Sequence, residues 1–230
     1  MPTPSREQQR RARIFGAWFA LTFVFSIPAL ILYDPVLNDT GYILGEGSLT
    51  RVELGAFFEV LTAISGIATA VVIWPIVRRQ SQTLALGYVA VRTFESVMIV
   101  TGAISLLSVV TLREDLAGSA SERSLDVAGQ SLVAFHDWTF LFGPAFCAGL
   151  GNGLILGYLM YRSGLMPPRL ALIGVIGGPL SVIGATFVLF GAWEQTDSTQ
   201  FLFTLPEIVW EASIVVYMLW KGFRPSPILA

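Results

Sequence analysis

The sequence has few charged residues and few of the side chains that enzymes use for chemistry. Only 13% of its 230 residues are charged, whereas soluble domains average about 25%. A single cysteine excludes an internal disulfide and a multi-thiolate metal site. A single histidine excludes a three-histidine zinc site and bis-histidine haem ligation within one chain. The formal net charge of −2 is too small to attract nucleic acid, so no nucleic-acid partner is expected.

Apolar residues make up 54% of the chain and gather in long runs. Crossing a bilayer as a helix takes roughly 20 mainly apolar residues. The predicted spans cover residues 14–33, 52–76, 84–112, 132–161, 168–191 and 203–222. The sequence therefore predicts an all-α integral membrane bundle of six transmembrane helices, surrounded by membrane lipid. We expect residues 1–230 to form a single membrane domain, because no linker or low-complexity segment divides them.

The charges in the connections predict the orientation of the bundle. Basic residues gather before the first span, after the second, around the fourth connection and after the last span, whereas the other connections are mainly acidic. The basic set is Arg6, Arg10, Arg11, Arg13, Arg78, Arg79, Arg162, Arg169, Lys221 and Arg224. Positively charged connections face the cytoplasm. Both termini are therefore expected on the cytoplasmic side.

Span 132–161 carries a stripe of small residues. Gly149, Gly153 and Gly157 are four residues apart, so they share one helix face and allow another helix to approach closely. Gly174 and Gly178 form a similar pair in the following span and are the expected partner. The stripe predicts helix packing within the chain, with a homodimer as the alternative.

Ionisable residues also fall inside the predicted spans, where they are costly and by default mark an interior or a functional site. The predicted ligand-binding residues are Glu59, Arg92, Glu95, His136, Asp137, Glu207 and Glu211. At about 1.5 Å per residue, Glu59 and Glu211 come out at one level. Glu207, like His136 and Asp137, comes out nearer the outer surface. The sequence predicts a polar cavity that opens outward above an arginine–glutamate floor near the midplane.

Spacing along the helices supports this shared interior. Arg92 and Glu95 are three residues apart and can pair along their own helix. Glu207 and Glu211 are four residues apart and face the same way. Asn152 lies deep in the fourth predicted span and is expected to add a hydrogen bond from below the cavity.

Each of these residues also has a purely structural interpretation. The pair of Arg92 and Glu95 can simply tie helices together, and His136 can be a neutral, hydrogen-bonded connector. Glu207 can be a solvated helix start. Asp137 can be an interfacial residue, because successive helical side chains diverge by about 100° and Asp137 cannot readily orient His136.

The excess of carboxyl groups is the sharpest chemical clue. Five acidic side chains in the predicted spans face one arginine and one histidine. Crowded carboxylates in a low dielectric cannot all stay ionised without compensation. Either some hold protons at neutral pH, or a cation or cationic ligand balances them.

Three classes of function remain open. In the first, the outward-facing cavity binds or moves a small ligand or a proton. In the second, the protein is an intramembrane metal-dependent enzyme, hydrolase-like, with His136, Glu59 and Glu211 as candidate metal ligands. In the third, it is a non-catalytic membrane partner or assembly protein. No catalytic residue and no cofactor is predicted. The sequence lacks H-E-x-x-H, G-x-S-x-G and C-x-x-C motifs, which favours a non-enzyme without deciding the matter.

Several segments carry a family resemblance. They are FVFSIPALILYDPVLNDTGYILG, ALGYVAVRTFESVMIVTGAISLLSVVTLRED, HDWTFLFGP, YLMYRSGLMPPRLALIGVIGGPL and WEASIVVYMLWKGF. Together they resemble an uncharacterised family of bacterial multi-pass membrane proteins, domain of unknown function 4386, from Ala12 to Arg224. The positions that match its recurrent motifs are Arg92, Glu95, His136, Asp137 and Glu211. The resemblance implies a small integral protein of the bacterial cytoplasmic membrane, and it supplies no activity, substrate or cofactor.

Overall fold

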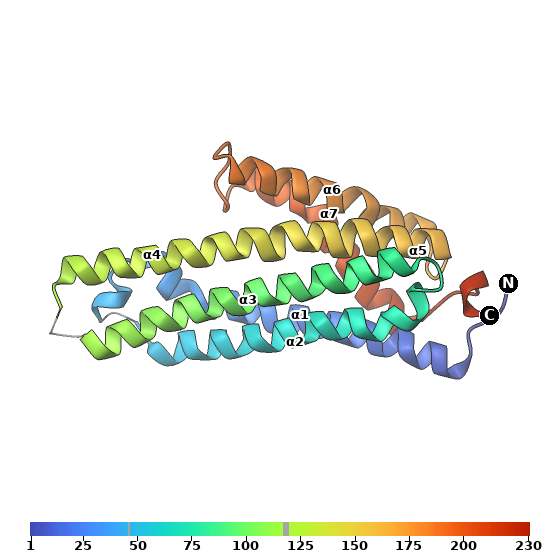
Figure 1. The fold of residues 1–230 in the computed structure, drawn as a ribbon, viewed down its shortest axis with the longest axis horizontal. Coiled ribbons are helices and arrows are strands. Elements are labelled where there is room, and N and C mark those ends of the chain that lie inside the picture. The colour runs from blue at the N-terminus through green and yellow to red at the C-terminus, as the bar shows by residue number, and fades with distance from the viewer. Residues whose placement is uncertain (46, 117–119) are drawn as a thin grey trace.

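The computed structural model describes residues 1–45, 47–116 and 120–230, and six helical spans in these ranges are long and apolar enough to cross a membrane. The spans are α1 (Arg6–Asn38), α2 (Leu49–Val77), α3 (Gln82–Leu116), a fourth span (Glu122–Ser163), α6 (Pro168–Leu189) and α7 (Ser198–Trp220). Each predicted range overlaps one of these helices, so the predicted all-α bundle of six spans is confirmed. Both termini lie at one end of the bundle (Figure 1), which we call the terminal end; their cytoplasmic location stays a prediction.

The fourth span is built from four consecutive segments. They are α4 (Glu122–Phe140), the π-helical segments η2 (Leu141–Ala145) and η3 (Ala148–Leu156), and α5 (Gly157–Ser163). Pro144 lies inside η2 and has no N–H to donate, so one backbone hydrogen bond of the helix is missing at this point. π-Helical turns are rare and are frequently found at functional sites.

Side-chain caps explain where the helices begin. At α1, Ser5 and Gln8 form a capping box, in which each side chain accepts a hydrogen bond from the other residue's backbone N–H. Ser121 caps α4 through its hydroxyl group. Asp197 caps α7, and its Oδ1 accepts a hydrogen bond of 2.6 Å from the N–H of Thr199. This last cap fixes how deep the polar residues of α7 lie.

The six spans form a ring. Each span packs against the next one along the chain, and α7 closes the ring by packing against α1. At the terminal end all six spans contribute to one apolar core, which includes Phe15, Phe19, Ile73, Leu156 and Trp210. That core fills the inside of the ring and seals it on the side of the termini.

The opposite end of the bundle is built differently. A second apolar core joins α1, α2, α3 and α4 with the 3-10 turn η1 (Tyr42–Leu44), and its described members include no residue of α6 or α7. The hairpin of α6 and α7 diverges from the other helices towards its connecting loop (Figure 1). The ring is therefore filled at the terminal end and spread apart at the other.

The glycine stripe of the fourth span lies directly against α6. A Cβ at Gly149 would fall 2.7 Å from the carbonyl oxygen of Gly178, and one at Gly157 would fall 3.0 Å from the backbone nitrogen of Val175. At Gly153 a Cβ would overlap the backbone of Gly178. No side chain separates the two backbones here. The structure thus places the stripe in intramolecular packing, and the homodimer stays a prediction.

We expect Gly149→Ala to destabilise the protein, because its new methyl group would press on the backbone of α6. Overpacking of this kind costs typically about 1–3 kcal/mol. Gly87→Ala is the matched control, since its Cβ would meet only Ile155 Cδ1, at 3.8 Å. The measurement is the apparent melting temperature in a mild detergent. A Gly149→Ala variant as stable as Gly87→Ala would contradict the close backbone contact.

Candidate functional site

A cavity of about 630 Å³ lies inside the ring, beyond the terminal core. Residues of α1, α2, α3, the fourth span, α6 and α7 line it, together with the loop before α7. The predicted site residues that line it are Glu59, Arg92, Glu95, His136, Glu207 and Glu211. Asp137 does not: its side chain is 56% exposed and lines a separate pocket of about 190 Å³ near η1.

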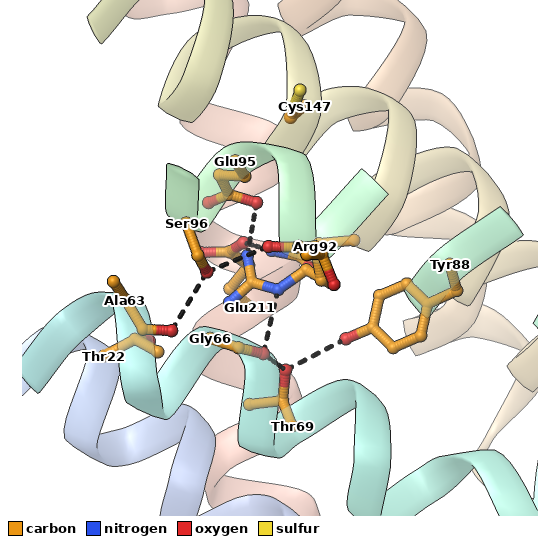
Figure 2. Close-up of polar contacts among 12 residues, drawn as sticks. Thr22, Ala63, Gly66, Thr69, Tyr88, Arg92, Glu95, Ser96, Cys147 and Glu211 are labelled. Carbon is orange, nitrogen blue, oxygen red and sulfur yellow. Dashed lines mark hydrogen bonds and ion pairs between the residues drawn. The ribbon is translucent and has the colours of Figure 1, made fainter. Parts of the chain in front are cut away.

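The floor of the cavity is an ion pair. Arg92 Nη1 lies 2.6 Å from Glu95 Oε2, and the two side chains are only 4% and 9% exposed. Arg92 Nε donates a second hydrogen bond, of 3.4 Å, to the carbonyl oxygen of Gly66 on α2. Ser96 continues the network by donating to the carbonyl oxygen of Ala63 at 3.0 Å (Figure 2). The predicted pairing of Arg92 with Glu95 is confirmed, and the pair also ties α3 to α2.

Glu211 lies beside this floor and is held from the fourth span. Asn152 Nδ2 donates a short hydrogen bond to Glu211 Oε1; a hydrogen bond from Asn152 was predicted, but its partner was not. The carbonyl oxygen of Asn152 in turn accepts a hydrogen bond of 2.7 Å from Trp210 Nε1. Among the ionisable groups that act on Glu211, Arg92 has the largest electrostatic effect. Figure 2 shows Glu211 next to the Arg92 guanidinium group.

Glu207 lies one helical turn before Glu211 and is only 3% exposed. Neither of its carboxylate oxygens has a hydrogen-bond partner in the described part of the chain. Gly153 makes room for it, since a Cβ at that position would collide with Glu207 Oε2. A carboxyl group buried in this way either holds a proton or pairs with a cation that the chain itself does not supply.

Two expectations for Glu207 are wrong: it is not near the outer surface, and it is not a solvated helix start. The polar residues at the start of α7 led us to place the beginning of the last span at residue 203, whereas the helix begins at Ser198. Glu207 therefore lies nine residues into the helix (207 − 198), or roughly 14 Å along its axis.

A second polar group lies nearer the divergent end. The hydroxyl group of Tyr33 donates a hydrogen bond of 3.1 Å to Glu59 Oε2. The ring of Tyr33 packs edge-on against the imidazole of His136, with ring centroids 5.8 Å apart. Gly102 allows α3 to approach this ring, because a Cβ there would fall 3.1 Å from His136 Cδ2. Sequence analysis missed Tyr33, since a tyrosine at the end of a span is ordinarily an interfacial residue.

The candidate metal ligands do not form one site. Glu59 is engaged by Tyr33 and lies near His136, whereas Glu211 is engaged by Asn152. Across residues 1–45, 47–116 and 120–230, no group of three or more His, Cys, Asp or Glu side chains is placed to hold a metal ion. The sequence predicted Glu59 and Glu211 at the same depth along the helix axes. Depth alone does not say which side of the ring a residue occupies.

His136 and Asp137 do approach each other, contrary to the expectation. His136 Nδ1 lies 3.4 Å from Asp137 Oδ1. The two side chains leave the helix in different directions, but the imidazole ring turns this nitrogen back towards the neighbouring carboxylate. Because Asp137 is outside the cavity, the contact links His136 to the exposed surface of the bundle.

A polar stripe along α7 is a further feature that sequence analysis overlooked. Gln200, Thr204, Glu207 and Glu211 are spaced by four, three and four residues and all line the cavity. This spacing puts them on one helix face. Gln200 is 6% exposed, and its Oε1 has no hydrogen-bond partner among the described residues. The helical period was the available signal, but the predicted start at 203 left Gln200 outside the span.

Comparison with known proteins assigns the chain to a family. The model of "Domain of unknown function (DUF4386)" matches residues 14–222. The chain belongs to the DUF4386 family. No curated protein and no solved structure matches it. The resemblance noted from the sequence is thus confirmed, and membership together with six apolar spans makes this DUF4386 chain a multi-pass membrane protein. The bacterial cytoplasmic membrane stays a prediction.

The buried ion pair gives a test of the floor. We expect Arg92→Met to destabilise the protein strongly, because it leaves Glu95 buried without a partner; such losses are about 3–5 kcal/mol. The double variant Arg92→Met with Glu95→Leu should regain most of the loss, since no buried charge is then left unpaired. Apparent melting temperatures of the purified variants measure both effects.

Glu7→Gln is the control for this test. Glu7 is 76% exposed and pairs with Arg11 at 3.6 Å, and such surface pairs are worth about 0–1 kcal/mol. If the double variant is as unstable as Arg92→Met alone, the loss does not come from the unpaired charge of Glu95.

Proposed function

We propose that this DUF4386 protein binds a small organic cation in its cavity, with Glu207 and Glu211 pairing with the positive charge. The observation that carries the proposal is the carboxyl group of Glu207. It is 3% exposed, lines the cavity, and has no partner for either oxygen among the residues described. A bound cation would supply the missing partner.

The charges around the cavity support a cationic ligand. Four glutamates line it, against Arg92 and His136. Arg92 is already paired with Glu95 at 2.6 Å, and Glu59 accepts a hydrogen bond from Tyr33. Glu211 accepts a hydrogen bond from Asn152, so Glu207 is the glutamate of the cavity whose carboxylate has no partner among the described residues. An unpaired charge in a low-dielectric interior costs several kcal/mol, and a ligand with one positive charge relieves that cost.

The rest of the lining favours an organic cation over a hard metal ion. A calcium ion takes about 6–8 oxygen ligands, whereas the free oxygens near Glu207 come mainly from one helix. The walls include Ile99, Phe140, Ala145 and Ala148, which suit the methyl or methylene groups of an ammonium ion. An aromatic face such as that of Phe140 also attracts cations. The volume of about 630 Å³ falls within the roughly 300–1,000 Å³ of small-molecule sites.

The proposal is for binding from one side of the bundle. The terminal core fills the ring below the floor, so a ligand reaches Glu207 only from the divergent end or from the side. With the predicted orientation, this is the outer side of the membrane.

Choline is a suitable probe, and its uncharged carbon analogue, 3,3-dimethylbutan-1-ol, is the matched comparison. We expect the purified protein to bind choline in calorimetric titrations and not to bind the alcohol. Glu207→Gln should weaken choline binding at least about tenfold, because truncating one partner of a buried charge pair costs about 2–5 kcal/mol. Asp115→Asn is the control carboxyl variant, since Asp115 is exposed and does not line the cavity, and it should bind as the unaltered protein does. Equal binding by Glu207→Gln would refute the assigned role of Glu207.

Stability without ligand separates this proposal from a purely structural role of the acidic residues. If Glu207 serves a ligand, its unpaired buried carboxyl group destabilises the ligand-free protein. Glu207→Gln removes that group and should therefore raise the apparent melting temperature in the absence of choline. If the acids instead hold the bundle together, the same variant lowers the melting temperature and no choline binding is found. That pair of results would support the assembly role.

A further inference from the structure

We infer that the bound cation is the head group of an amphiphile whose hydrocarbon chain leaves the bundle sideways, between α1 and α7. This inference rests on the proposed function and adds the class of ligand. It depends on where α1 and α7 touch, what lines the cavity where they do not, and which polar groups lead to Glu207.

In five of the six contacts between neighbouring spans, a glycine next to the cavity brings the two helices together at one level. Nearer the divergent end, the hairpin of α6 and α7 separates from the fourth span (Figure 1). On α2, a Cβ at Gly55 would fall 2.7 Å from the ring of Tyr33 of α1. On α3, one at Gly102 would fall 2.6 Å from Thr139 Oγ1 of the fourth span. Gly66 lies as closely against α3, Gly149 and Gly153 against α6, and Gly177 against α7. The helices therefore approach too closely at these places to leave an opening.

The contact between α1 and α7 is closed only at the terminal end. There Gly16 lies against α7, and a Cβ at this position would fall 2.9 Å from Met218 Cβ. Further along, both helices line the cavity with apolar side chains that are also exposed. Ile27 and Leu30 of α1 are each 55% exposed, as is Phe201 of α7, and Ile208 is 37% exposed.

A side chain that both lines a cavity and is exposed lies at the rim of its opening. We call the gap bordered by Ile27, Leu30, Phe201 and Ile208 the lateral opening. Ile208 lies ten residues into α7 (208 − 198), or roughly 15 Å along its axis, and the hydrocarbon core is about 30 Å thick. The lateral opening therefore reaches about the middle of the membrane and faces lipid, where an alkyl chain is at no disadvantage.

The groups inside the opening are acceptors that fit a positively charged head. From the loop before α7 inward, Asp197, Gln200, Thr204, Glu207 and Glu211 all line the cavity. Two of them are buried and have unpartnered acceptor oxygens, Gln200 Oε1 and both carboxylate oxygens of Glu207. This polar track runs beside the apolar rim. A head group can follow the track down to Glu207 while its chain stays in lipid. A ligand without a chain does not require an opening to lipid.

Octyltrimethylammonium and choline share the trimethylammonium head and differ in the chain, so together they test the inference. In nanodiscs, Ile27→Trp and Ile208→Trp should each weaken octyltrimethylammonium binding at least about tenfold, the equivalent of roughly 1.4 kcal/mol. The bulky ring blocks the exit of a chain attached to the bound head. Both variants should weaken choline binding much less than octyltrimethylammonium binding, because both residues line the cavity but a short cation needs no lateral exit. Empty nanodiscs correct for uptake of the probe by lipid.

Val24→Trp and Val209→Trp are the matched controls. Val24 on α1 is 57% exposed and Val209 on α7 is 44% exposed, close to their partners in the test, but neither lines the cavity. These variants should bind both probes normally. If octyltrimethylammonium binding depends on Glu207 but is unaffected by Ile27→Trp and Ile208→Trp, the lateral opening is not used and only this inference fails. If choline binding does not depend on Glu207, the proposed function itself fails.

Photolabelling gives a readout that needs no variant. An octyltrimethylammonium with a diazirine at the end of its chain should label residues 22–31 of α1 and 201–209 of α7, and excess unlabelled octyltrimethylammonium should suppress the labelling. Suppressible labelling confined to the loop residues 195–197 would mean that the chain points towards the membrane surface, and would overturn the lateral exit.

Discussion

The direct contact between the backbones of η3 and α6 is the constraint on which the rest of the structure depends. Gly149 and Gly153 of η3 and Gly157 of α5 leave one face of the fourth span without side chains, and Gly178 provides the facing glycine on α6. In lipid, where apolar residues gain little by leaving one hydrocarbon environment for another, such close packing is a main source of helix association. The contact anchors the hairpin of α6 and α7 to the fourth span at mid-membrane, so its far end is free to diverge.

The same contact decides where the charge of α7 lies. Gly153 faces α6 and also borders Glu207, whose carboxylate occupies the space that a side chain at position 153 would fill. Gly177 brings the backbone of α6 against the backbone nitrogen of Glu207, from which a Cβ would lie 2.8 Å away. Glycine packing thus holds a carboxylate deep in the membrane. Structural needs alone would be met as well by an apolar residue, which is why Glu207 points to a ligand.

The buried polar residues differ in how completely the chain satisfies them. Arg92 has Glu95 and the Gly66 carbonyl oxygen as partners. Below it, Thr69 Oγ1 and the Tyr88 hydroxyl group lie 3.3 Å apart and end the polar region at the edge of the terminal core. These groups make the floor rigid. The unsatisfied acceptors among the described residues lie on α7 and on the fourth span: Gln200 Oε1, both carboxylate oxygens of Glu207, and Asn152 Oδ1. Gln200 Oε1 lies against Gly184 of α6 and Glu207 Oε2 against Gly153, so these acceptors are on the side of the cavity formed by α7, α6 and the fourth span.

Hydropathy and helical spacing were sufficient to predict the six spans, the pairing of Arg92 with Glu95, and a hydrogen bond from Asn152 to the polar cluster, although not that Glu211 accepts it. They failed where a helix begins with polar residues. Asp197 is a good N-cap with Thr199 two residues later, yet an average of hydropathy discards Ser198, Thr199 and Gln200. The cap was the local signal that would have placed Glu207 at its true depth.

Contacts that depend on the position of a helix around the ring could not be predicted. Residue counts give depth along a helix but not the neighbour that a residue faces. Glu59 and Glu211 were predicted at one depth, yet they lie ten (59 − 49) and thirteen (211 − 198) residues from the starts of their helices and belong to different polar groups. Tyr33 joins Glu59 only because α1 lies against α2 at Gly55. The π-helical turns of η2 and η3 add a further rotation that a period of 3.6 residues does not contain.

The contact between α1 and α7 is closed at the terminal end and open towards the divergent end. This difference limits the routes by which a ligand could reach or leave the cavity in this conformation. At the terminal end, Gly16 lets the helices touch, and Phe15, Phe19 and Trp210 fill the ring behind them. A head group bound at Glu207 could pass to that side only if these three aromatic side chains separated. Separation would break a core to which every span contributes, at a cost of about 1.5–3 kcal/mol for each large side chain exposed to water. The lateral opening requires no such step. Under the proposed function, this conformation would exchange its ligand with one side of the membrane and its lipid, as a one-sided binding site does.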